Sequence, residues 1–370
     1  MTTVVLGVDV GGTGVRARLA HLPAASLARA QVAPVGETSA PALAEARVAR
    51  AGGARLADLV AEVAGRVLAA AGRPEVRLSV VGCAGAALLG PDLRAAVAGA
   101  LTGQVVICSD LLTAYVGAAG FQAGVVLAAG TGAVALGTDR AGTWNRVDGW
   151  GHLLGDDGGG AWIGREGMRA AYRALDGRPG GSLPLLEALR ATHGDPGAFV
   201  AGLTAASDRS GILAAFAPAV IAAATPRRST RPGPLASPAH PAGLGAPERL
   251  AHPADLGATG DDDPVAAGIV RAAAGHLADT LLAALPEGAP ARAWPTGNLL
   301  QPGSSLTSAF GAVLRTRRPE LELREAHGAP LDGAVALAAA VLAGPLPPGM
   351  AEAGALSGAS CMPRRAAYPW

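Results

Sequence analysis

The sequence predicts an α/β protein made of two similar halves with a cleft between them. The chain has 370 residues, which is long for a single hydrophobic core. A unit of strand, Gly-Thr-Gly turn and strand occurs twice, once after residue 10 and once after residue 129. Stretches with helical spacing separate the strands, so each half is expected to be a mixed sheet covered by helices.

The first half begins with a predicted hairpin. Residues 3–10 are a β-branched run and residues 15–19 alternate apolar and Arg side chains, with a glycine turn between them. An Ala-, Leu- and Arg-rich stretch predicts a helix over residues 42–71. Strands are expected at 76–82 and 104–109, with a short helix near 93–101 between them.

After Asp110, a short predicted helix through Tyr115 leads into the second half. Strands are expected at 124–129 and 133–138, on either side of the second glycine turn. Residues 212–223 and 263–284 have apolar residues at helical spacing and are expected to pack over the second sheet. Residues 225–253 are rich in Pro, Ser, Gly, His and Arg, which indicates a surface insertion or a lid.

The composition excludes several kinds of chemistry. All 30 basic residues are Arg, because the sequence contains no Lys. A Walker A loop and a Schiff-base enzyme each need a Lys side chain, so neither fits this chain. The net charge of +1, without a basic stripe, argues against a nucleic-acid partner.

Cellular context is also predicted from composition. The three cysteines, Cys83, Cys108 and Cys361, have no CxxC or Cys/His ligand spacing, which argues against zinc and disulfides and favours a reducing cytoplasm. No signal peptide, membrane span or membrane partner is expected. The oligomeric state stays open, a homodimer included.

Two glycine turns and one aspartate are candidates for phosphate chemistry. Glycines after a strand let backbone N–H groups approach phosphate oxygens, and Asp9 just before the first turn can hold Mg²⁺ directly or through water. Taken alone, that turn is equally consistent with a tight hairpin capped by Asp9. Asp110 follows a buried strand, where α/β proteins place ligand-contacting groups, and is a candidate general base.

Residues 148–164 form the most informative stretch. They contain two Trp, one His and two adjacent Asp residues separated by glycines, a composition poorly suited to either core or solvated surface. Sugar recognition explains this composition, because aromatic and backbone groups line a sugar ring while carboxylates accept hydroxyl or ammonium donors. The alternative is a glycine-rich loop whose Trp residues fill a domain interface.

Five segments match a known family in order along the chain. They are GVDVGGTGVRARLA (7–20), CSDLLTAYVGA (108–118), VVLAAGTGAVALG (125–137), GWGHLLGDDGGGAWIGREG (149–167) and a weaker TGNLL (296–300). The chain resembles the BadF/BadG/BcrA/BcrD-type ATPase family, and within it the N-acetylglucosamine and glucosamine kinases. This resemblance implies the two-lobed fold shared by actin, hexokinase and heat-shock chaperone ATPases, a duplicated ribonuclease H-like fold with a cleft between the lobes.

The resemblance also implies a role for each site residue. Asp110 is implied as the catalytic base, and Asp9 with Asp110 as the groups that position Mg²⁺. The implied ATP-binding residues are Gly11, Gly12, Thr13 and Gly14 with Arg16, then Gly130, Thr131 and Gly132, and Gly297 and Asn298 in the adenosine motif. The implied sugar-facing residues are Asp110, Gly149, Trp150, His152, Asp156, Asp157 and Ser39.

Some of these roles have alternatives. Arg16 either helps to bind phosphate or is a solvated side chain on the hairpin. His152 either contacts the sugar or braces its loop. The lobes are expected at residues 1–112 and 113–370, with a closing helix that starts at residues 330–337 and returns to the first lobe.

Departures from the family pattern bear on the substrate. The loop at residues 36–41, where related kinases use an Asn to meet the sugar, contains no Asn, and Gly-Asp-Glu-Gly reads Gly-Asp-Asp-Gly at 155–158. Thr296 stands where the adenosine motif usually has its first glycine. A site richer in carboxylates than in amide donors favours a free ammonium group, so glucosamine is the expected substrate and N-acetylglucosamine the alternative.

The expected reaction is ATP-dependent phosphorylation of the amino sugar at its 6-hydroxyl, with Mg²⁺. Two other functions remain open on this fold. One is an ATPase activator of a radical dehydratase, which would need Cys ligands for an iron–sulfur cluster. The other is a non-catalytic sugar sensor.

Overall fold

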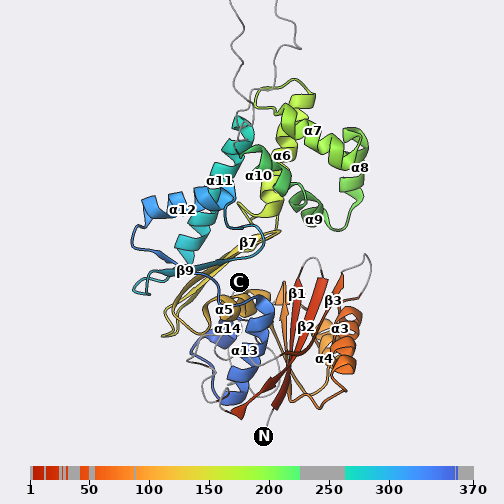
Figure 1. Ribbon diagram of the computed structural model, residues 1–370, viewed down its shortest axis with the longest axis vertical. Helices are drawn as coiled ribbons and strands as arrows, with labels where there is room; N and C mark the ends of the chain where they lie inside the picture. The colour runs from red at the N-terminus through yellow and green to blue at the C-terminus, as the bar shows by residue number, and fades with distance from the viewer. Residues whose placement is uncertain are drawn as a thin grey trace, which may run out of the picture.

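The computed structural model describes residues 3–11, 14–24, 27, 31, 42–49, 55–86, 89–225, 263–354 and 356. It contains two five-stranded sheets, with strand orders β3-β2-β1-β4-β5 and β10-β9-β6-β7-β8. When the second sheet is followed from β8 to β10, both sheets show two antiparallel pairings followed by two parallel ones. The two halves therefore have the same topology, each in its own lobe (Figure 1).

The first sheet is formed by the N-terminal part of the chain. Its central strand β1 is buried over most of its length, as expected of a strand covered on both faces. The elements are β1 (Thr3–Gly11), β2 (Gly14–Leu22), β3 (Ala42–Ala49), α3 (Leu56–Ala70), β4 (Leu78–Cys83), α4 (Pro91–Gly99), β5 (Gln104–Ser109) and α5 (Asp110–Ala119).

The second sheet carries most of the remaining helices. The elements are β6 (Gly124–Ala129), β7 (Ala133–Thr138), β8 (Trp144–Asp148), α6 (Gly160–Leu175), α7 (Leu183–His193), α8 (Pro196–Ala205), α9 (Arg209–Ala214), α10 (Ala217–Ala223), α11 (Pro264–Ala284), β9 (Arg292–Thr296), α12 (Ser305–Arg317), β10 (Glu322–Leu323), α13 (Pro330–Ala343) and α14 (Met350–Ala353).

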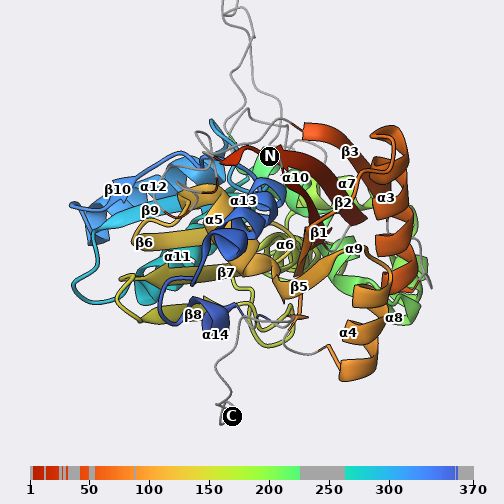
Figure 2. The ribbon, with the colours of Figure 1, turned by 90° about the horizontal axis from the view of Figure 1, so that it is seen from below.

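Three apolar cores alternate with the two sheets. One fills the space between the first sheet and α3 and α4, and another lies between the second sheet and α6, α7, α10, α11 and α12. The central core holds α5 and α13 together with residues of both sheets. Viewed from below, α3 and α13 lie on opposite sides of the first sheet (Figure 2). The molecule is thus a stack of helices and sheets with α5 and α13 at its centre.

Helices α5 and α13 pack closely because glycines line their contact. A Cβ on Gly333 of α13 would lie 1.9 Å from the carbonyl oxygen of Thr113, and one on Gly117 of α5 would lie 2.3 Å from that of Ala329. The carboxylate of Asp332 in the first turn of α13 accepts the Ala329 N–H and pairs with Arg18 of β2. These contacts attach α13, which is remote in sequence, to the first sheet.

The predicted helix over residues 42–71 is wrong in its first part. Residues 42–49 form the strand β3, paired antiparallel with β2, and the helix α3 begins only at Leu56. The side chains of Ala44, Ala46 and Val48 face the core, while Glu45 pairs with Arg18 on β2. Pairing with the hairpin therefore overrides the helical preference of the alanines.

The expected helix over residues 212–223 is divided into α9 and α10. Pro218 stands in the first turn of α10 and has no N–H with which to continue the preceding helix. Asp263 caps α11, as its side chain accepts the Val265 N–H. The predicted insertion at 225–253, Thr225 apart, lies outside the described residues.

Helix α11 is long and apolar enough to cross a membrane by length and composition alone. In the fold it contacts β6 and β7, and nine of its residues are buried, among them Ala273, Leu277 and Leu281 in the core of the second lobe.

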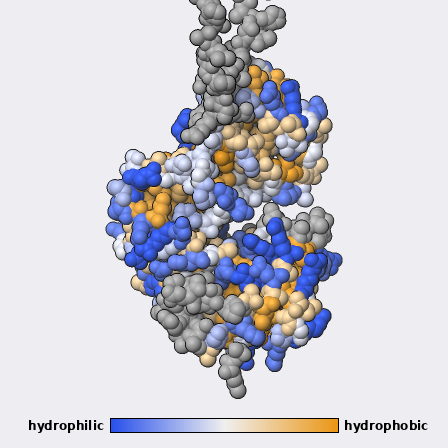
Figure 3. All heavy atoms as spheres, viewed as in Figure 1, coloured by the Kyte–Doolittle hydropathy of each residue, from blue (hydrophilic) through white to orange (hydrophobic). Residues whose placement is uncertain are grey.

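The space-filling view shows the surface indented between the upper and lower lobes (Figure 3).

Candidate active site

Asp9 and Arg16 form an ion pair within the first hairpin. They lie directly opposite each other on β1 and β2, and the Arg16 Nη2 lies 2.7 Å from the Asp9 Oδ2. The Asp9 side chain is 5% exposed and that of Arg16 is 43% exposed. Arg16 is therefore held against the candidate metal ligand while almost half of its side chain stays exposed, and both of its predicted roles remain predictions.

Asp110 lies at the same edge of the first sheet as Asp9, with strand β4 between them. Strands β1, β4 and β5 are parallel, with Asp9 opposite Gly82 and Gly82 opposite Cys108, so Asp110 follows just beyond the carboxyl end of β5. Gly82 allows α5 to approach, because a Cβ there would be 2.4 Å from the Thr113 Oγ1. The sheet register thus brings the two predicted carboxylates to the same edge.

The pKa of Asp110 is raised above its ordinary value. Burial is the main cause, and the neighbouring Asp9 carboxylate adds to it. The Leu111 N–H, which donates to Oδ1 at 2.9 Å, the Ser109 hydroxyl and the positive charge of Arg146 act in the opposite direction. A carboxyl group with a raised pKa is suited to accept a proton from a hydroxyl group.

The second glycine turn is fixed from one side by helix α6. The Gly130 carbonyl accepts the Gly160 N–H and the Thr131 carbonyl accepts the Ala161 N–H, both at 2.8 Å. Because the C=O and N–H of a trans peptide point in opposite directions, the N–H groups of Thr131 and Gly132 are directed away from α6. This arrangement offers two backbone donors to an anion on the other side of the turn.

The predicted adenosine motif lies against this second turn. Strands β6 and β9 are parallel neighbours, and the Leu299 N–H donates to the Ala129 carbonyl at 3.1 Å. Gly297 has a φ of +100°, and a Cβ there would lie 2.2 Å from the Ala129 oxygen. Gly297 and the exposed Asn298 are therefore adjacent to Gly130, as one nucleotide site requires.

Asp148 organises the loop that sequence reasoning linked to the sugar. Its Oδ1 accepts the N–H groups of Gly149 at 2.8 Å and Asp156 at 2.6 Å, and its Oδ2 accepts that of Asp157 at 3.2 Å. Asp148 itself has a φ of +65°. Asp148 was not among the predicted site residues. An Asp before a glycine-rich loop commonly accepts hydrogen bonds from nearby backbone N–H groups, and this signal could have identified it.

Asp156 connects this loop to the second glycine turn. Its carboxylate accepts backbone N–H groups of Gly151 and Ala133, and a Cβ on Gly132 would lie 2.3 Å from its Oδ2. Burial and the nearby Asp148 carboxylate raise the pKa of Asp156. Asp157 is exposed, and the carbonyl of His152 accepts a hydrogen bond from the Arg165 guanidinium at 3.0 Å.

Arg146 is a second residue that sequence reasoning missed. It lies on β8 with its Cζ 5.2 Å from the centre of the Trp150 ring, and its Nη2 donates to the Gly149 carbonyl at 2.8 Å. The Trp150 side chain is 62% exposed, and Leu153 and Leu154 are more exposed still. Trp150 is therefore not an interface plug in this structure.

Not every predicted residue can be placed. Gly11 and Gly14 pair at the end of the first hairpin. Gly12, Thr13 and Ser39 lie outside the described residues. Within the described chain, the structure joins the site into two groups: Asp9, Arg16 and Asp110 on the first lobe, and Gly130, Thr131, Gly132, Gly149, Trp150, His152, Asp156, Asp157, Gly297 and Asn298 on the second.

The carboxylates of Asp9 and Asp110 are suitable ligands for a magnesium ion. Mg²⁺ in phosphate-transfer sites is commonly held by one or two carboxylates, with phosphate and water oxygens completing its shell. Asp9 uses Oδ2 for Arg16, and Asp9 and Asp110 lie at the same carboxyl edge of the parallel strands of the first sheet. No cluster of three or more His, Cys, Asp or Glu residues occurs in the described part of the chain. Two carboxylates together with a nucleotide are consistent with such an ion.

The described cysteines do not suit an iron–sulfur cluster. Cys83 and Cys108 are buried in the first sheet, and burial strongly raises the pKa of the Cys108 thiol. A cluster ligand is a thiolate, which this environment disfavours. Cys361 lies outside the described residues.

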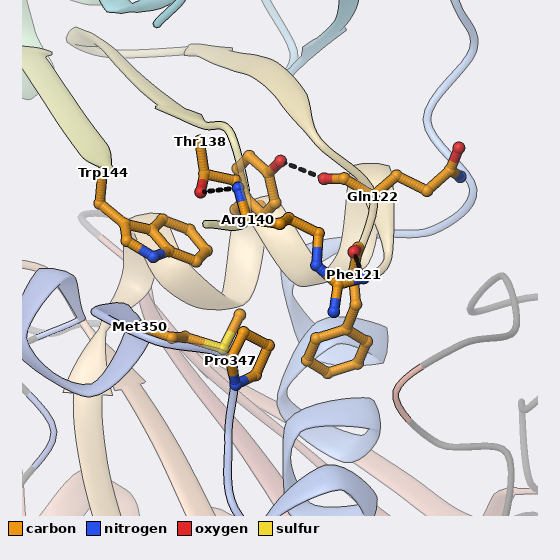
Figure 4. A pocket seen from close by; sticks show the side chains of 8 residues that line it. Phe121, Gln122, Thr138, Arg140, Trp144, Pro347 and Met350 are labelled. Carbon is orange, nitrogen blue, oxygen red and sulfur yellow. Dashed lines mark hydrogen bonds between the residues drawn. The ribbon is translucent and has the colours of Figure 1, made fainter. Parts of the chain in front are cut away.

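A small pocket lies apart from these groups. It is a shallow, partly open depression with no room for a water molecule, between α5, β7, β8 and the segment before α14 (Figure 4). Tyr115 donates to the Gln122 carbonyl, and Trp144 contacts the Tyr115 ring edge-to-face with centroids 5.4 Å apart. None of the predicted site residues lines it, so this pocket is packing between the lobes and not part of the candidate site.

The fold and the two groups of residues define a two-lobed protein of the actin and hexokinase type. Residues 6–232 match the BadF/BadG/BcrA/BcrD ATPase family. The match covers more than half of the chain, so the protein belongs to this family.

Individual relatives agree with this assignment. Over 76 residues the chain is 33% identical to an N-acetylmuramic acid/N-acetylglucosamine kinase of Clostridium acetobutylicum, covering 20% of this chain and 25% of that protein. Over 53 residues it is 47% identical to an N-acetyl-D-glucosamine kinase of Dictyostelium discoideum, covering 14% of this chain and 17% of that protein. The chain thus aligns with a quarter or less of the length of these relatives.

A solved structure confirms the fold over nearly the whole chain. A Chromobacterium violaceum protein named as a candidate N-acetylglucosamine kinase superposes with a TM-score of 0.61 at 23% identity. The match covers 91% of this chain and 99% of that one. The predicted two-lobed α/β fold is therefore confirmed.

Proposed function

We propose that this protein transfers the γ-phosphoryl group of ATP to the 6-hydroxyl of an amino sugar. The observation that carries the proposal is the placement of Asp110 at the same carboxyl edge of parallel strands as Asp9, with a raised pKa. In this role Asp110 accepts the proton of the attacking hydroxyl group. The names of the aligned kinases support an amino sugar as the acceptor.

The nucleotide is proposed to lie between the two glycine turns. The N–H groups of Thr131 and Gly132 point away from α6 and can stabilise charge on the phosphate oxygens. Gly297 and Asn298 lie next to this turn, at the position proposed for the adenosine end. Mg²⁺ held by Asp9 and Asp110 would supply charge neutralisation to the phosphates. We further infer that the lobes, at residues 1–112 and 113–370, close over both substrates to exclude water.

The preferred acceptor follows from how the loop carboxylates are used. The expectation of glucosamine depended on a site richer in carboxylates than in amide donors. In the structure Asp148 accepts three backbone N–H groups and backbone N–H groups of Gly151 and Ala133 act on Asp156, whereas Asp157 is exposed. These contacts weaken the reason to favour an ammonium group, and with the names of the aligned kinases they lead us to place N-acetylglucosamine first and glucosamine second.

A coupled assay of ADP release with N-acetylglucosamine, glucosamine, glucose and mannosamine tests the proposal. We expect turnover with amino sugars, and Asp110→Asn should lower kcat by roughly a hundredfold or more while nucleotide binding persists. Asp92→Asn, in the exposed first turn of α4, is the matched control and should behave as wild type. Sugar binding without ADP release would instead indicate a sensor, and near-normal activity of Asp110→Asn would remove Asp110 as the base.

A further inference from the structure

Arg146 is a cation held in one position on the second lobe. Its guanidinium donates to the Gly149 carbonyl and lies over the Trp150 ring. Gly149 has a φ of +76°, and a Cβ there would lie 3.0 Å from the Arg146 Nη2. The glycine therefore lets the guanidinium pack directly on the backbone of the loop, so a normally flexible side chain has two anchors.

The charge of Arg146 is not neutralised by a carboxylate. Among the described residues no Asp or Glu lies within ion-pair distance of it, whereas Arg16 pairs with Asp9 and Arg165 pairs with Glu166. One guanidinium nitrogen is used on the Gly149 carbonyl, and an Arg side chain has five N–H donors. Donors and charge therefore remain for a ligand.

This charge acts on the candidate base across the site. The groups that influence Asp110 are Asp9 on β1, the Leu111 amide and Ser109 beside it, and Arg146 on β8. Arg146 is the one among these that belongs to the second lobe. An acceptor whose ring lies on the loop at 149–150 would lie next to this cation, because Arg146 contacts both Gly149 and Trp150.

We propose that Arg146 is the specificity-determining residue that selects an uncharged N-acyl hexosamine over a hexosamine with a protonated amine. Arg146 is exposed in this structure, and the proposed closure of the lobes would shield it from water. Its guanidinium then repels an ammonium group and can donate to an amide carbonyl oxygen. The inference rests on the proposed function, since it concerns the acceptor of that same reaction. It adds a residue outside the sequence motifs that were assigned to the sugar.

The test is the ratio of kcat/KM for N-acetylglucosamine to that for glucosamine. Arg146→Gln should lower this ratio roughly tenfold or more, because a charge-assisted hydrogen bond and a repulsion are both lost. Arg146→Lys keeps the charge and should restore most of the discrimination against glucosamine. Arg169→Gln removes an exposed Arg that pairs with Glu166 on α6 and should leave the ratio unchanged.

Calorimetric binding of the two sugars to wild type and to each variant separates this inference from the proposed function. An unchanged ratio in Arg146→Gln, in an enzyme that phosphorylates amino sugars, overturns the role of Arg146 alone. If wild type turns over neither sugar, the proposed function fails, and the ratio of binding constants decides about Arg146. If Arg146→Gln lowers kcat/KM equally for both sugars and Arg146→Lys does not restore it, Arg146 has a purely structural role. This result also overturns the inference.

Discussion

At the scale of single residues, the site is built from polar side chains that are already engaged with the protein. Asp9 is bonded to Arg16, Asp148 to three backbone N–H groups and Asp156 to two. Asp110 differs, because burial and the Asp9 carboxylate raise its pKa. This unfavourable placement would make Asp110 suited to the proposed role of base, and we expect it to lower the stability of the fold.

Asp110→Asn is therefore expected to stabilise the protein while it inactivates it. A carboxyl with a raised pKa in the folded state favours folding below its ordinary pKa of 3.8, and that contribution is lost as the pH rises through the folded-state pKa. At neutral pH the Asn variant should melt roughly 1–3 °C higher than wild type. The difference should shrink toward pH 3.8; an equal or lower Tm at neutral pH would contradict the predicted cost of the ionised carboxylate.

Asp148→Ala should disable sugar use while sparing the nucleotide. The N–H groups of Gly149, Asp156 and Asp157 lose their acceptor, so the loop at 149–157 loses its shape. We expect KM for the sugar to rise about tenfold to a hundredfold, with little change in the affinity for ATP. Asp139→Ala is the control, because it removes an acceptor of the Ala141 and Thr143 N–H groups in the turn between β7 and β8, outside the candidate site. Steady-state kinetics with each substrate varied in turn measures the KM for the sugar and for ATP.

At the scale of elements, glycines determine how closely the helices approach. Gly333 on α13 faces the backbone of α5, whereas a Cβ on Gly65 of α3 would meet no other atom within 4 Å. Both lie inside helices, so the intrinsic preference for Ala over Gly is the same at the two sites. Any difference in stability between Gly→Ala substitutions at these two sites therefore measures the cost of disturbing the contact between α5 and α13.

Gly333→Ala should lower the free energy of unfolding by about 2–3 kcal/mol, because the two helices must separate. Gly65→Ala should raise it by about 0.5–1 kcal/mol, because Ala loses less conformational entropy in a helix. Chemical denaturation of both variants measures the two values. Similar changes of the same sign would show that the close contact of α5 and α13 is not tight in solution.

The sequence was sufficient for the strands and turns whose local pattern agrees with their tertiary surroundings. The strands predicted at 104–109, 124–129 and 133–138 coincide with β5, β6 and β7, since each is a short apolar run next to a turn. Residues 42–49 were misassigned because their alanines favour a helix, and only pairing with β2 makes them a strand. Arg146 and Asp148 were missed because their roles depend on a loop geometry that residue types do not specify.

At the scale of the whole molecule, the two groups of site residues lie on different lobes. Asp9, Arg16 and Asp110 belong to the first sheet and its edge, and the glycine turn at 130–132 with the loop at 149–157 belongs to the second. Substrates that contact both groups should draw the lobes together. We expect a smaller radius of gyration by X-ray scattering with a non-hydrolysable ATP analogue and sugar than with either one alone, and an unchanged radius would contradict closure.

The position of α13 also affects how the chain is made. This helix covers one face of the first sheet and is joined to it by Asp332 and Arg18, yet it lies at residues 330–343. During synthesis, strands β1, β2, β4 and β5 leave the ribosome long before the helix that shields them. The apolar face of the N-terminal lobe is therefore protected only after residues 330–343 have been translated, and until then chaperones have access to it.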